Sequence, residues 1–264
     1  MSSSLQDNYI KKESLYGAQN YSPLSVVIEQ GEGAYLWDVD GNKYLDMVSA
    51  YSAVSHGHSH PELIKTLQSQ STKLAITSRA FYTEPFATFL EKLSNTSGFE
   101  SVLTMNTGAE AVETSIKAAR RWGYFSKGIP EDNAEIIVAN GNFHGRTTTI
   151  VSFSSDSSYK DGFGPFTPGF KTADYCGSCN CESIENCLSI ESFEKKINKN
   201  TCAILVEPIQ GEAGIRVPTE GWLTKLRELC DAKNILLILD ESSLDWAELE
   251  NYLHSNMKIS CLMD

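Results

Sequence analysis

Strand-like and helix-like segments alternate along the chain from residue 101 onward. Short apolar runs rich in β-branched residues predict strands, and longer segments with apolar residues at helical spacing predict helices. Such an alternation predicts an α/β fold, in which a mostly parallel sheet is covered by helices on both faces. The predicted strands span residues 101–106, 135–139, 148–153, 170–174, 202–206 and 235–239, and the predicted helices span residues 109–126, 189–198 and 220–233.

The N-terminal part of the chain has a different pattern. Residues 1–20 show no clear periodicity, so we expect them to be loosely ordered. Turns at Gln30-Gly31 and Asp40-Gly41 separate three short apolar runs, and Asp-Gly between such runs is a strong hairpin signal. The runs that we expect to form strands are residues 25–28, 33–38 and 43–47.

Two helices are expected between this segment and the alternating part. Pro61 suits the first position of a helix, and a second helix is predicted from Glu84 to Ser97, where Gly98 would end it. The sequence therefore predicts a small N-terminal β-segment over residues 1–60, followed by a larger domain over residues 61–241.

The last predicted strand ends in a carboxylate. Five consecutive apolar residues, Ile235 to Leu239, fit a strand that is buried on both faces, and Asp240 follows them directly. Open α/β sheets place ligand-binding groups at the carboxyl ends of their strands. Because a buried carboxylate needs a cationic partner or several hydrogen-bond donors, Asp240 is a candidate binding residue, for which a protonated ring nitrogen would be a suitable partner.

Three loops that follow strands carry further candidate chemistry. Residues 105–110 place Gly108 at a helix start, where backbone N–H groups favour a phosphate, although an ordinary tight turn has the same sequence features. Residues 141–146 combine an aromatic ring that could stack on a planar ligand with an arginine that could hold a carboxylate. Residues 206–212 carry two glutamates, which are either functional or simply solvated.

Composition narrows the function further. The 264 residues are 41% hydrophobic and 21% charged, as in ordinary soluble domains, and the net charge of −12 argues against a nucleic-acid partner. No apolar run is long enough to span a bilayer. The N-terminus shows neither a secretory signal nor a transit peptide, so we expect a cytoplasmic protein with no membrane partner.

Two clusters suggest metal ligands but have simpler interpretations. Four of the seven cysteines fall within residues 176–187, where they could hold zinc or form a reduced surface loop. The alternating histidines His56, His58 and His60 lead directly into the predicted helix start at Pro61, which disfavours a metal site. The serines of residues 152–158 lack a nucleophile-elbow pattern.

These features together resemble the class III pyridoxal-phosphate aminotransferases, and within that family the ornithine aminotransferase group. The resemblance covers about residues 12–241, interrupted by the cysteine-rich segment 176–187, which looks like an insertion. The motifs that carry it are Tyr16-Gly-Ala-Gln-Asn-Tyr21, Tyr35-Leu-Trp-Asp-Val39, Ser78-Arg-Ala-Phe-Tyr82, Met105-Asn-Thr-Gly108, Asp161-Gly-Phe-Gly-Pro-Phe166 and Val206-Glu-Pro-Ile-Gln-Gly-Glu-Ala213.

The resemblance implies the large domain of a fold-type-I pyridoxal-phosphate transferase, incomplete in this chain, and roles for individual residues. The cofactor pyridoxal 5′-phosphate would be bound by Thr107, Gly108, Ala109, Phe143, His144 and Asp240. Within that set, the residues at the helix start would hold the phosphate, Phe143 would stack on the ring, and Asp240 would pair with the pyridinium nitrogen. The substrate pocket would include Tyr21, Tyr51, Arg146, Glu207 and Glu212.

The implied reaction transfers the δ-amino group of ornithine to the 2-oxo acid 2-oxoglutarate, giving glutamate semialdehyde and glutamate. It requires a Schiff-base lysine, which follows Asp240 in the family. Here the resemblance stops at Glu241, residues 242–264 diverge, and Lys258 has no suitable context, so we expect a truncated chain without a catalytic lysine. We expect residues 242–264 to form a short amphipathic helix. An alternative is a non-catalytic half-site or interaction protein that pairs with a full-length aminotransferase; family members form homo-oligomers.

Overall fold

The computed structural model describes residues 5–177, 184, 187–242 and 259–261 of the chain. It divides into two compact units, residues 1–83 and residues 84–264, and each unit is described by itself. The domain boundaries predicted from the sequence, after residues 60 and 241, remain a prediction, because compactness does not show that a unit folds independently. Within the described residues, no helix has the length and apolar character needed to cross a lipid bilayer.

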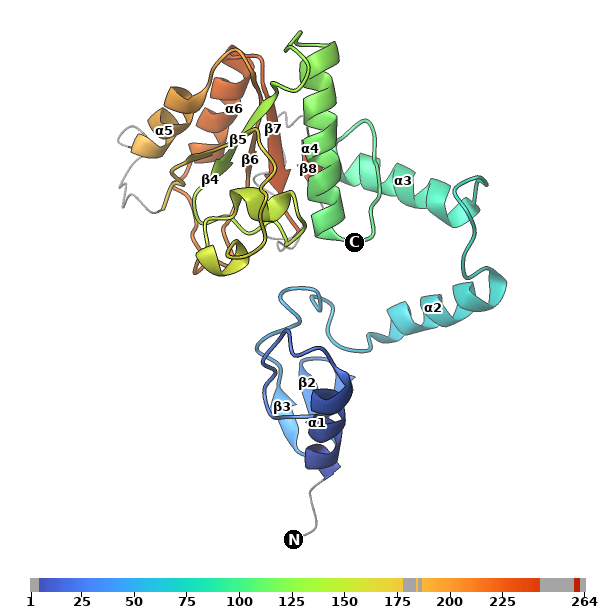
Figure 1. The fold of residues 1–264 in the computed structure, drawn as a ribbon. Coiled ribbons are helices and arrows are strands. Elements are labelled where there is room, and N and C mark those ends of the chain that lie inside the picture. The colour runs from blue at the N-terminus through green and yellow to red at the C-terminus, as the bar shows by residue number, and fades with distance from the viewer. Residues whose placement is uncertain (1–4, 178–183, 185–186, 243–258, 262–264) are drawn as a thin grey trace. The chain divides into compact units, whose positions relative to one another are not determined.

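The first unit is built around a small antiparallel sheet (Figure 1). Its strands pair in the order β1-β2-β3, and a helix lies at each end of the unit's sequence. The elements are α1 (Leu5–Tyr16), β1 (Ile28–Glu32), β2 (Tyr35–Asp38), β3 (Lys43–Leu45) and α2 (Pro61–Lys73). The prediction that residues 1–20 are loosely ordered is wrong for residues 5–16, which form α1.

Polar contacts attach α1 to this sheet. The Gln6 side chain accepts a hydrogen bond from the Val27 N–H at 3.1 Å and donates to the Asp40 carboxylate at 2.8 Å. Asp38 is buried and accepts hydrogen bonds from Asn42 and from the Tyr44 hydroxyl. The Gln6 contacts join residues 21 and 34 positions apart and carry no periodic signal, which explains why the sequence pattern did not reveal the helix.

The first hairpin also differs from its prediction. We expected a turn at Gln30-Gly31, but both residues lie in β1, and the pairing of Glu32 with Tyr35 places the turn at Gly33-Ala34. Gly33 has φ +55°, a conformation that glycine adopts without strain. The predicted turn at Asp40-Gly41 is confirmed, since it joins β2 to β3.

The second unit contains the parallel sheet. Its strands lie in the order β5-β4-β6-β7-β8, and every neighbouring pair is parallel. Together with the small antiparallel sheet, this confirms the predicted α/β fold class. The elements are α3 (Glu84–Ser97), α4 (Gly108–Phe125), β4 (Glu135–Ala139), β5 (Phe170–Ala173), α5 (Leu188–Lys196), β6 (Thr201–Val206), α6 (Trp222–Ala232), β7 (Leu236–Asp240) and β8 (Ile259–Cys261), with short 3-10 turns at Ile150–Phe153 and Ser157–Tyr159.

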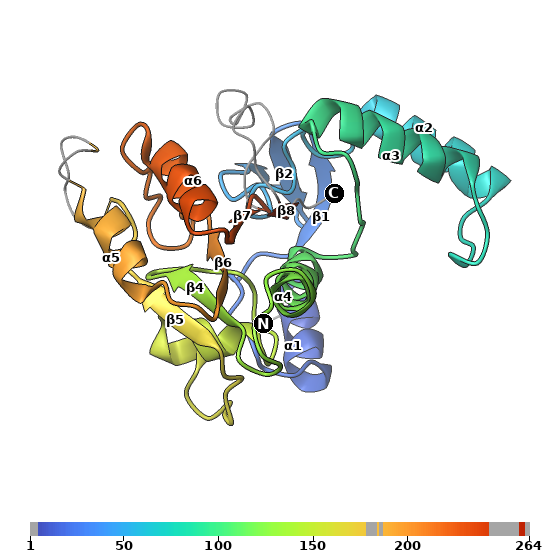
Figure 2. The ribbon, with the colours of Figure 1, turned by 90° about the horizontal axis from the view of Figure 1, so that it is seen from above.

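Helices cover both faces of this sheet (Figures 1 and 2). α4 packs on one face, where alternate residues of the strands, such as Ile136 and Val138, meet Val112 and Ile116 of the helix. α5 and α6 pack on the other face. Because both faces are covered, β6 and β7 are buried at every position, which matches their continuous apolar sequences.

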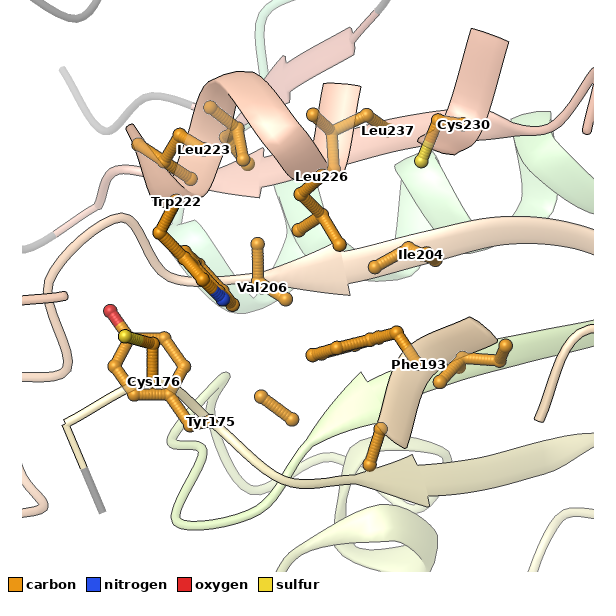
Figure 3. Packing of buried hydrophobic residues seen from close by; sticks show 14 of the residues in the cluster. Tyr175, Cys176, Phe193, Ile204, Val206, Trp222, Leu223, Leu226, Cys230 and Leu237 are labelled. Atoms are coloured by element: carbon orange, nitrogen blue, oxygen red, sulfur yellow. The ribbon is translucent and has the colours of Figure 1, made fainter. Parts of the chain in front are cut away.

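The core beneath α5 and α6 is organised around one tryptophan (Figure 3). Trp222 is fully buried, and its ring lies against Tyr175, with 4.9 Å between ring centroids, and against Phe193, with 6.1 Å. Its indole N–H donates to the Ser189 hydroxyl at 2.7 Å. This contact satisfies the polar atom of an otherwise apolar side chain and ties α6 to the start of α5.

Two predicted strands are absent from the described structure. Residues 101–106 form no ladder, and Leu103 is 74% exposed, because an apolar run becomes a strand only where a neighbouring strand is available. Residues 148–153 contain the 3-10 turn Ile150–Phe153, whose buried apolar side chains pack against the α4 face. In both segments tertiary context overrides local β-propensity.

The C-terminal segment contributes a strand. β8 pairs in parallel with β7, so that Asp240 lies opposite Cys261. The amphipathic helix predicted for residues 242–264 is wrong at residues 259–261, and residues 243–258 lie outside the described part of the chain. The predicted zinc ligands Cys179 and Cys181 also lie outside it.

Candidate cofactor site

A cavity of about 230 Å³ opens at the carboxyl ends of β6 and β7. It lies wholly within the second unit and draws its lining from four separate segments: the start of α4, the loop after β4, the loop after β6 and the end of β7. The lining residues are Thr107, Gly108, Ala109, Phe143, His144, Gly145, Glu207, Ile209, Asp240 and Ser242.

The start of α4 contributes backbone N–H groups to this cavity. Thr107 precedes the helix with extended backbone angles, and its hydroxyl accepts a hydrogen bond from the Glu110 N–H at 3.1 Å. The Glu110 carboxylate in turn accepts from the Asn106 N–H at 2.8 Å. These two contacts fix the helix start, and the N–H groups of the first turn are left to favour an anion.

Gly145 brings the loop after β4 close to α4. A Cβ atom at this position would lie 2.8 Å from the Ala109 Cβ, and the backbone has φ +109°, so only glycine fits without displacement. This close approach holds Phe143 and His144 next to the helix start. The sequence pattern thus places glycine where two cavity-lining segments meet.

Asp240 is buried at the end of β7 and is held from both sides. Its Oδ2 lies 2.6 Å from His144 Nδ1, and its Oδ1 accepts hydrogen bonds from the Ser242 hydroxyl at 2.6 Å and from the Ser242 N–H at 3.1 Å. The predicted need for cationic or donor partners is therefore met. Because all three contacts are short, the carboxylate has one fixed orientation.

The electrostatics of the cavity depend on three neighbouring titratable groups. Burial of the His144 ring lowers its pKa, but the hydrogen bond and the charge of Asp240 outweigh this effect, so the pKa of His144 is raised overall. Burial raises the pKa of Glu207 to about 7, and the Asp240 charge adds to the rise, whereas the His144 charge opposes it. The cavity thus holds one histidine–carboxylate pair and one glutamate that titrates near neutrality.

Phe143 is fixed through both its backbone and its ring. Its N–H donates to the Glu207 carboxylate at 3.2 Å, and its ring meets the Tyr159 ring at a centroid distance of 5.7 Å. The Arg146 guanidinium lies over Phe143 and Tyr159, at 5.5 and 4.8 Å from the ring centroids. Arg146 is exposed and is held beside the cavity by these rings.

The structure brings together most, but not all, of the predicted site residues. All six predicted cofactor residues line the cavity, and so does Glu207. Glu212 is exposed on the loop after β6 and is not a lining residue. Tyr21 and Tyr51 belong to the first unit, where their hydroxyl oxygens lie 2.7 Å apart. Their assignment to the substrate remains a prediction.

Sequence reasoning missed three lining residues, Gly145, Ile209 and Ser242. Gly145 lies inside the candidate loop 141–146, and its position between His144 and Arg146 is a signal present in the sequence. Ser242 follows the last residue of the resemblance, so no motif pointed to it. Its role depends on a side-chain hydrogen bond that only the folded loop reveals.

The histidine cluster has a structural role in the first unit. His58 Nε2 lies 2.7 Å from the Asp46 carboxylate, and the His58 backbone bridges to Gly33. Within the described residues, no group of three or more metal-ligating side chains is present. His58 therefore ties the loop after β3 to the first hairpin.

Comparison with known proteins identifies the class of protein to which this fold and cavity belong. Residues 16–243 match the aminotransferase class-III family, and the chain belongs to that family. The span of the match includes all the segments that line the cavity.

Within the family, the chain is a homologue of ornithine aminotransferases. It is 52% identical to the ornithine aminotransferase of Brevibacillus brevis over 88% of this chain and 55% of that protein. The fold matches that of the ornithine aminotransferase of Toxoplasma gondii with a TM-score of 0.84 and 40% identity, over 92% of this chain and 55% of the other. An acetylornithine aminotransferase from Elizabethkingia anophelis is 49% identical, with a TM-score of 0.75, over 90% of this chain and 55% of that one. The chain thus spans about half the length of these relatives.

Proposed function

We propose that this chain carries part of the pyridoxal 5′-phosphate site of an ornithine aminotransferase. One observation carries the proposal: the start of α4, the Phe143 ring and the buried Asp240–His144 pair line a single cavity. These three features offer an anion site, an aromatic surface and a carboxylate within one small volume. A phosphorylated, positively charged heterocycle needs all three.

The lining residues fit this cofactor. The N–H groups of Gly108 and Ala109 lie at the positive end of an 18-residue helix, which favours a phosphate. Asp240 keeps acceptor capacity beyond its bonds to His144 and Ser242, because each carboxylate oxygen has two acceptor sites. A protonated ring nitrogen would be a further donor to this carboxylate.

Each residue then has a physical task. When bound, the cofactor would supply a pyridine ring that acts as an electron sink. Asp240 holds the proton on the ring nitrogen, and His144 with Ser242 fixes the orientation of Asp240. Phe143 covers one face of the ring and excludes water from it. Arg146 binds the substrate α-carboxylate, which leaves the distal amine toward the ring.

The amine substrate in this proposal is ornithine, and the amino acceptor is 2-oxoglutarate. The support is the 52% identity to a protein named ornithine aminotransferase, together with an arginine beside the cavity that can hold an α-carboxylate. The similarity to an acetylornithine aminotransferase makes N-acetylornithine the natural comparison ligand. Both ligands present a δ-amine, so that only groups around the α-carbon distinguish them.

Cofactor binding tests the proposal. Titration of the chain with pyridoxal 5′-phosphate, followed by absorbance, should show saturable binding that Asp240→Asn weakens by about tenfold or more, equivalent to about 1.4 kcal/mol. Asn has nearly the same side-chain volume, but it removes the charge and replaces one acceptor oxygen with a donor NH2 group. The matched control is Asp132→Asn, an exposed aspartate outside the cavity, which should leave the affinity unchanged. An Asp240→Asn variant that binds the cofactor as tightly as the wild type and the Asp132→Asn control would refute the site.

Substrate recognition is tested separately on the cofactor-loaded chain. Arg146→Ala should weaken binding of ornithine, measured by calorimetry, by about tenfold. It should leave binding of 1,4-diaminobutane, which lacks the carboxylate, unchanged. N-acetylornithine should bind less tightly than ornithine to the wild type. An equal loss for both diamines in Arg146→Ala would show that the arginine does not hold the carboxylate.

Covalent attachment of the cofactor is a further readout. The lysine that the family resemblance implies follows Asp240, and the only lysine after that residue here is Lys258, outside the described residues. Borohydride reduction of the cofactor-loaded chain, after free cofactor has been removed, should therefore leave no pyridoxyl group on Lys258. An adduct on Lys258, located by peptide mass mapping, would contradict this expectation.

A further inference from the structure

The two cysteines that bracket the cysteine-rich segment lie in contact with each other. Cys176 Sγ and Cys187 Sγ are 3.4 Å apart, and both side chains are buried beneath α5 and α6. Cys176 follows β5, and Cys187 directly precedes α5, so the two cysteines flank residues 177–186 on either side. The structure therefore brings into contact two cysteines that are 11 positions apart in the sequence.

The surroundings hold both sulfurs in place. The Thr219 N–H donates to Cys176 Sγ at 3.3 Å, and Cys187 Sγ lies 3.0 Å from the Ser189 hydroxyl. Ser189 also accepts the Trp222 indole N–H, and Tyr175, next to Cys176, lies against the Trp222 ring (Figure 3). The two thiols are thus part of the packed core.

We propose that Cys176 and Cys187 form a reversible disulfide, which links the two ends of residues 177–186, when the protein is exposed to a peroxide. A disulfide requires the sulfurs to approach to about 2.0 Å, which is about 1.4 Å closer than they lie as thiols. Rotation about the Cα–Cβ bonds is the movement that brings two neighbouring thiols to this distance.

The chemistry balances with hydrogen peroxide as the oxidant. One thiolate attacks the peroxide and becomes a sulfenic acid, and the peroxide leaves as water after protonation. The second thiolate displaces the sulfenic hydroxyl as water and forms the S–S bond. In sum, two thiols and one peroxide give one disulfide and two waters.

Burial sets the rate of this reaction. It raises the pKa of Cys187, so that less thiolate is present at neutral pH. Oxidation should therefore be slow near neutrality and faster as the pH rises. A small oxidant such as peroxide is suited to this site, because a bulky one would have to displace the packed core around Trp222.

The disulfide would act on the start of α5 and on the loop after β6. It would fix the start of α5 to the segment that carries Tyr175, whose hydroxyl donates to the Glu207 and Pro208 carbonyl oxygens at 3.1 and 2.9 Å. These carbonyls belong to the loop after β6 that lines the cavity. The disulfide should therefore raise the midpoint of thermal unfolding by several degrees, since it removes loop entropy from the unfolded chain.

Peptide mapping tests the proposal on the full 264-residue chain. The reduced protein is treated with hydrogen peroxide at about pH 8, alkylated, digested and analysed by mass spectrometry with and without dithiothreitol. The expected product is a Cys176–Cys187 cross-linked peptide that has lost two hydrogens and that dithiothreitol cleaves. Cys187→Ser should abolish both the cross-link and the rise in the unfolding midpoint.

A matched control and three outcomes keep the test decisive. Cys202→Ser removes a buried cysteine from the opposite core, beneath α4, and should leave the cross-link unchanged. A cross-link to Cys179 or Cys181, sulfinic acid without any cross-link, or stoichiometric zinc that protects the cysteines of the reduced protein from alkylation would each overturn the proposal. The peptide map of the wild-type protein tests the proposal even if Cys187→Ser fails to fold.

Discussion

The Glu207 side chain offers a test of the cavity's electrostatics that requires no cofactor. Glu207 is buried next to the Asp240 carboxylate, and its pKa is raised from 4.5 to about 7. Glu207→Gln keeps an amide oxygen to accept the Phe143 N–H bond and removes the ionisable group. The change therefore isolates the cost of a second negative charge inside the cavity.

The sign and size of the effect follow from the pKa. A carboxyl whose pKa is higher in the folded than in the unfolded state binds more protons when folded, so its contribution to stability falls as the pH rises from 4.5 to about 7 and then levels off. At about 1.4 kcal/mol for each pKa unit, the full loss is roughly 3 kcal/mol for Glu207. The opposing charge of His144 is already included in that pKa, so the expected difference stays at roughly 3 kcal/mol.

Urea unfolding at about pH 5 and pH 8 measures this difference, with tryptophan fluorescence, to which the buried Trp222 contributes, as the signal. Wild type and Glu207→Gln should have similar unfolding free energies at the lower pH, and the variant should be more stable at the higher pH. Glu220→Gln, at an exposed glutamate before α6, is the matched control and should show no such dependence. An unfolding free-energy difference between Glu207→Gln and wild type that is the same at both pH values would refute the raised pKa.

Two further predictions concern the shape of the cavity. Gly145→Ala should lower the unfolding free energy by roughly 1–3 kcal/mol and weaken cofactor binding, because the new Cβ would lie 2.8 Å from the Ala109 Cβ. The control is Gly162→Ala, since Gly162 also has a positive φ but has open space around it. This control should lower stability less and should leave cofactor binding unchanged. Ser242→Ala removes one of the donors to Asp240 and should weaken pyridoxal 5′-phosphate binding by roughly tenfold, measured by absorbance titration. Ser242→Thr keeps the hydroxyl, and retained affinity in this variant would show that the hydroxyl is the group required.

The sequence predicted the parallel sheet well, because its strongest signals are local. The apolar run from Ile235 to Leu239 has the composition of a strand buried on both faces, and the structure contains β7 at Leu236–Asp240 with every position buried. The helix start at Gly108 was predicted within one residue, since glycine follows a strand-like run there, and the structure adds Thr107 as the cap. The carboxylate at the strand end followed from the same pattern.

The remaining features depend on contacts between distant segments. Ser101 to Met105 has the composition of a strand, but the pairing partner that would make it one is absent from the described structure. The bond from the Phe143 N–H to the Glu207 carboxylate joins residues 64 positions apart, and no local pattern encodes it. The raised pKa of Glu207 arises from burial, which a single sequence does not specify.

The central claim is that the start of α4, Phe143 and Asp240 bind one cofactor together. A crystal structure of the chain with pyridoxal 5′-phosphate tests it most directly. We expect the phosphate within hydrogen-bond distance of the Gly108 and Ala109 N–H groups, the ring nitrogen within about 3 Å of the Asp240 carboxylate, and the ring face against Phe143. A cofactor bound elsewhere on the chain, or bound here with its ring nitrogen away from Asp240, would contradict it.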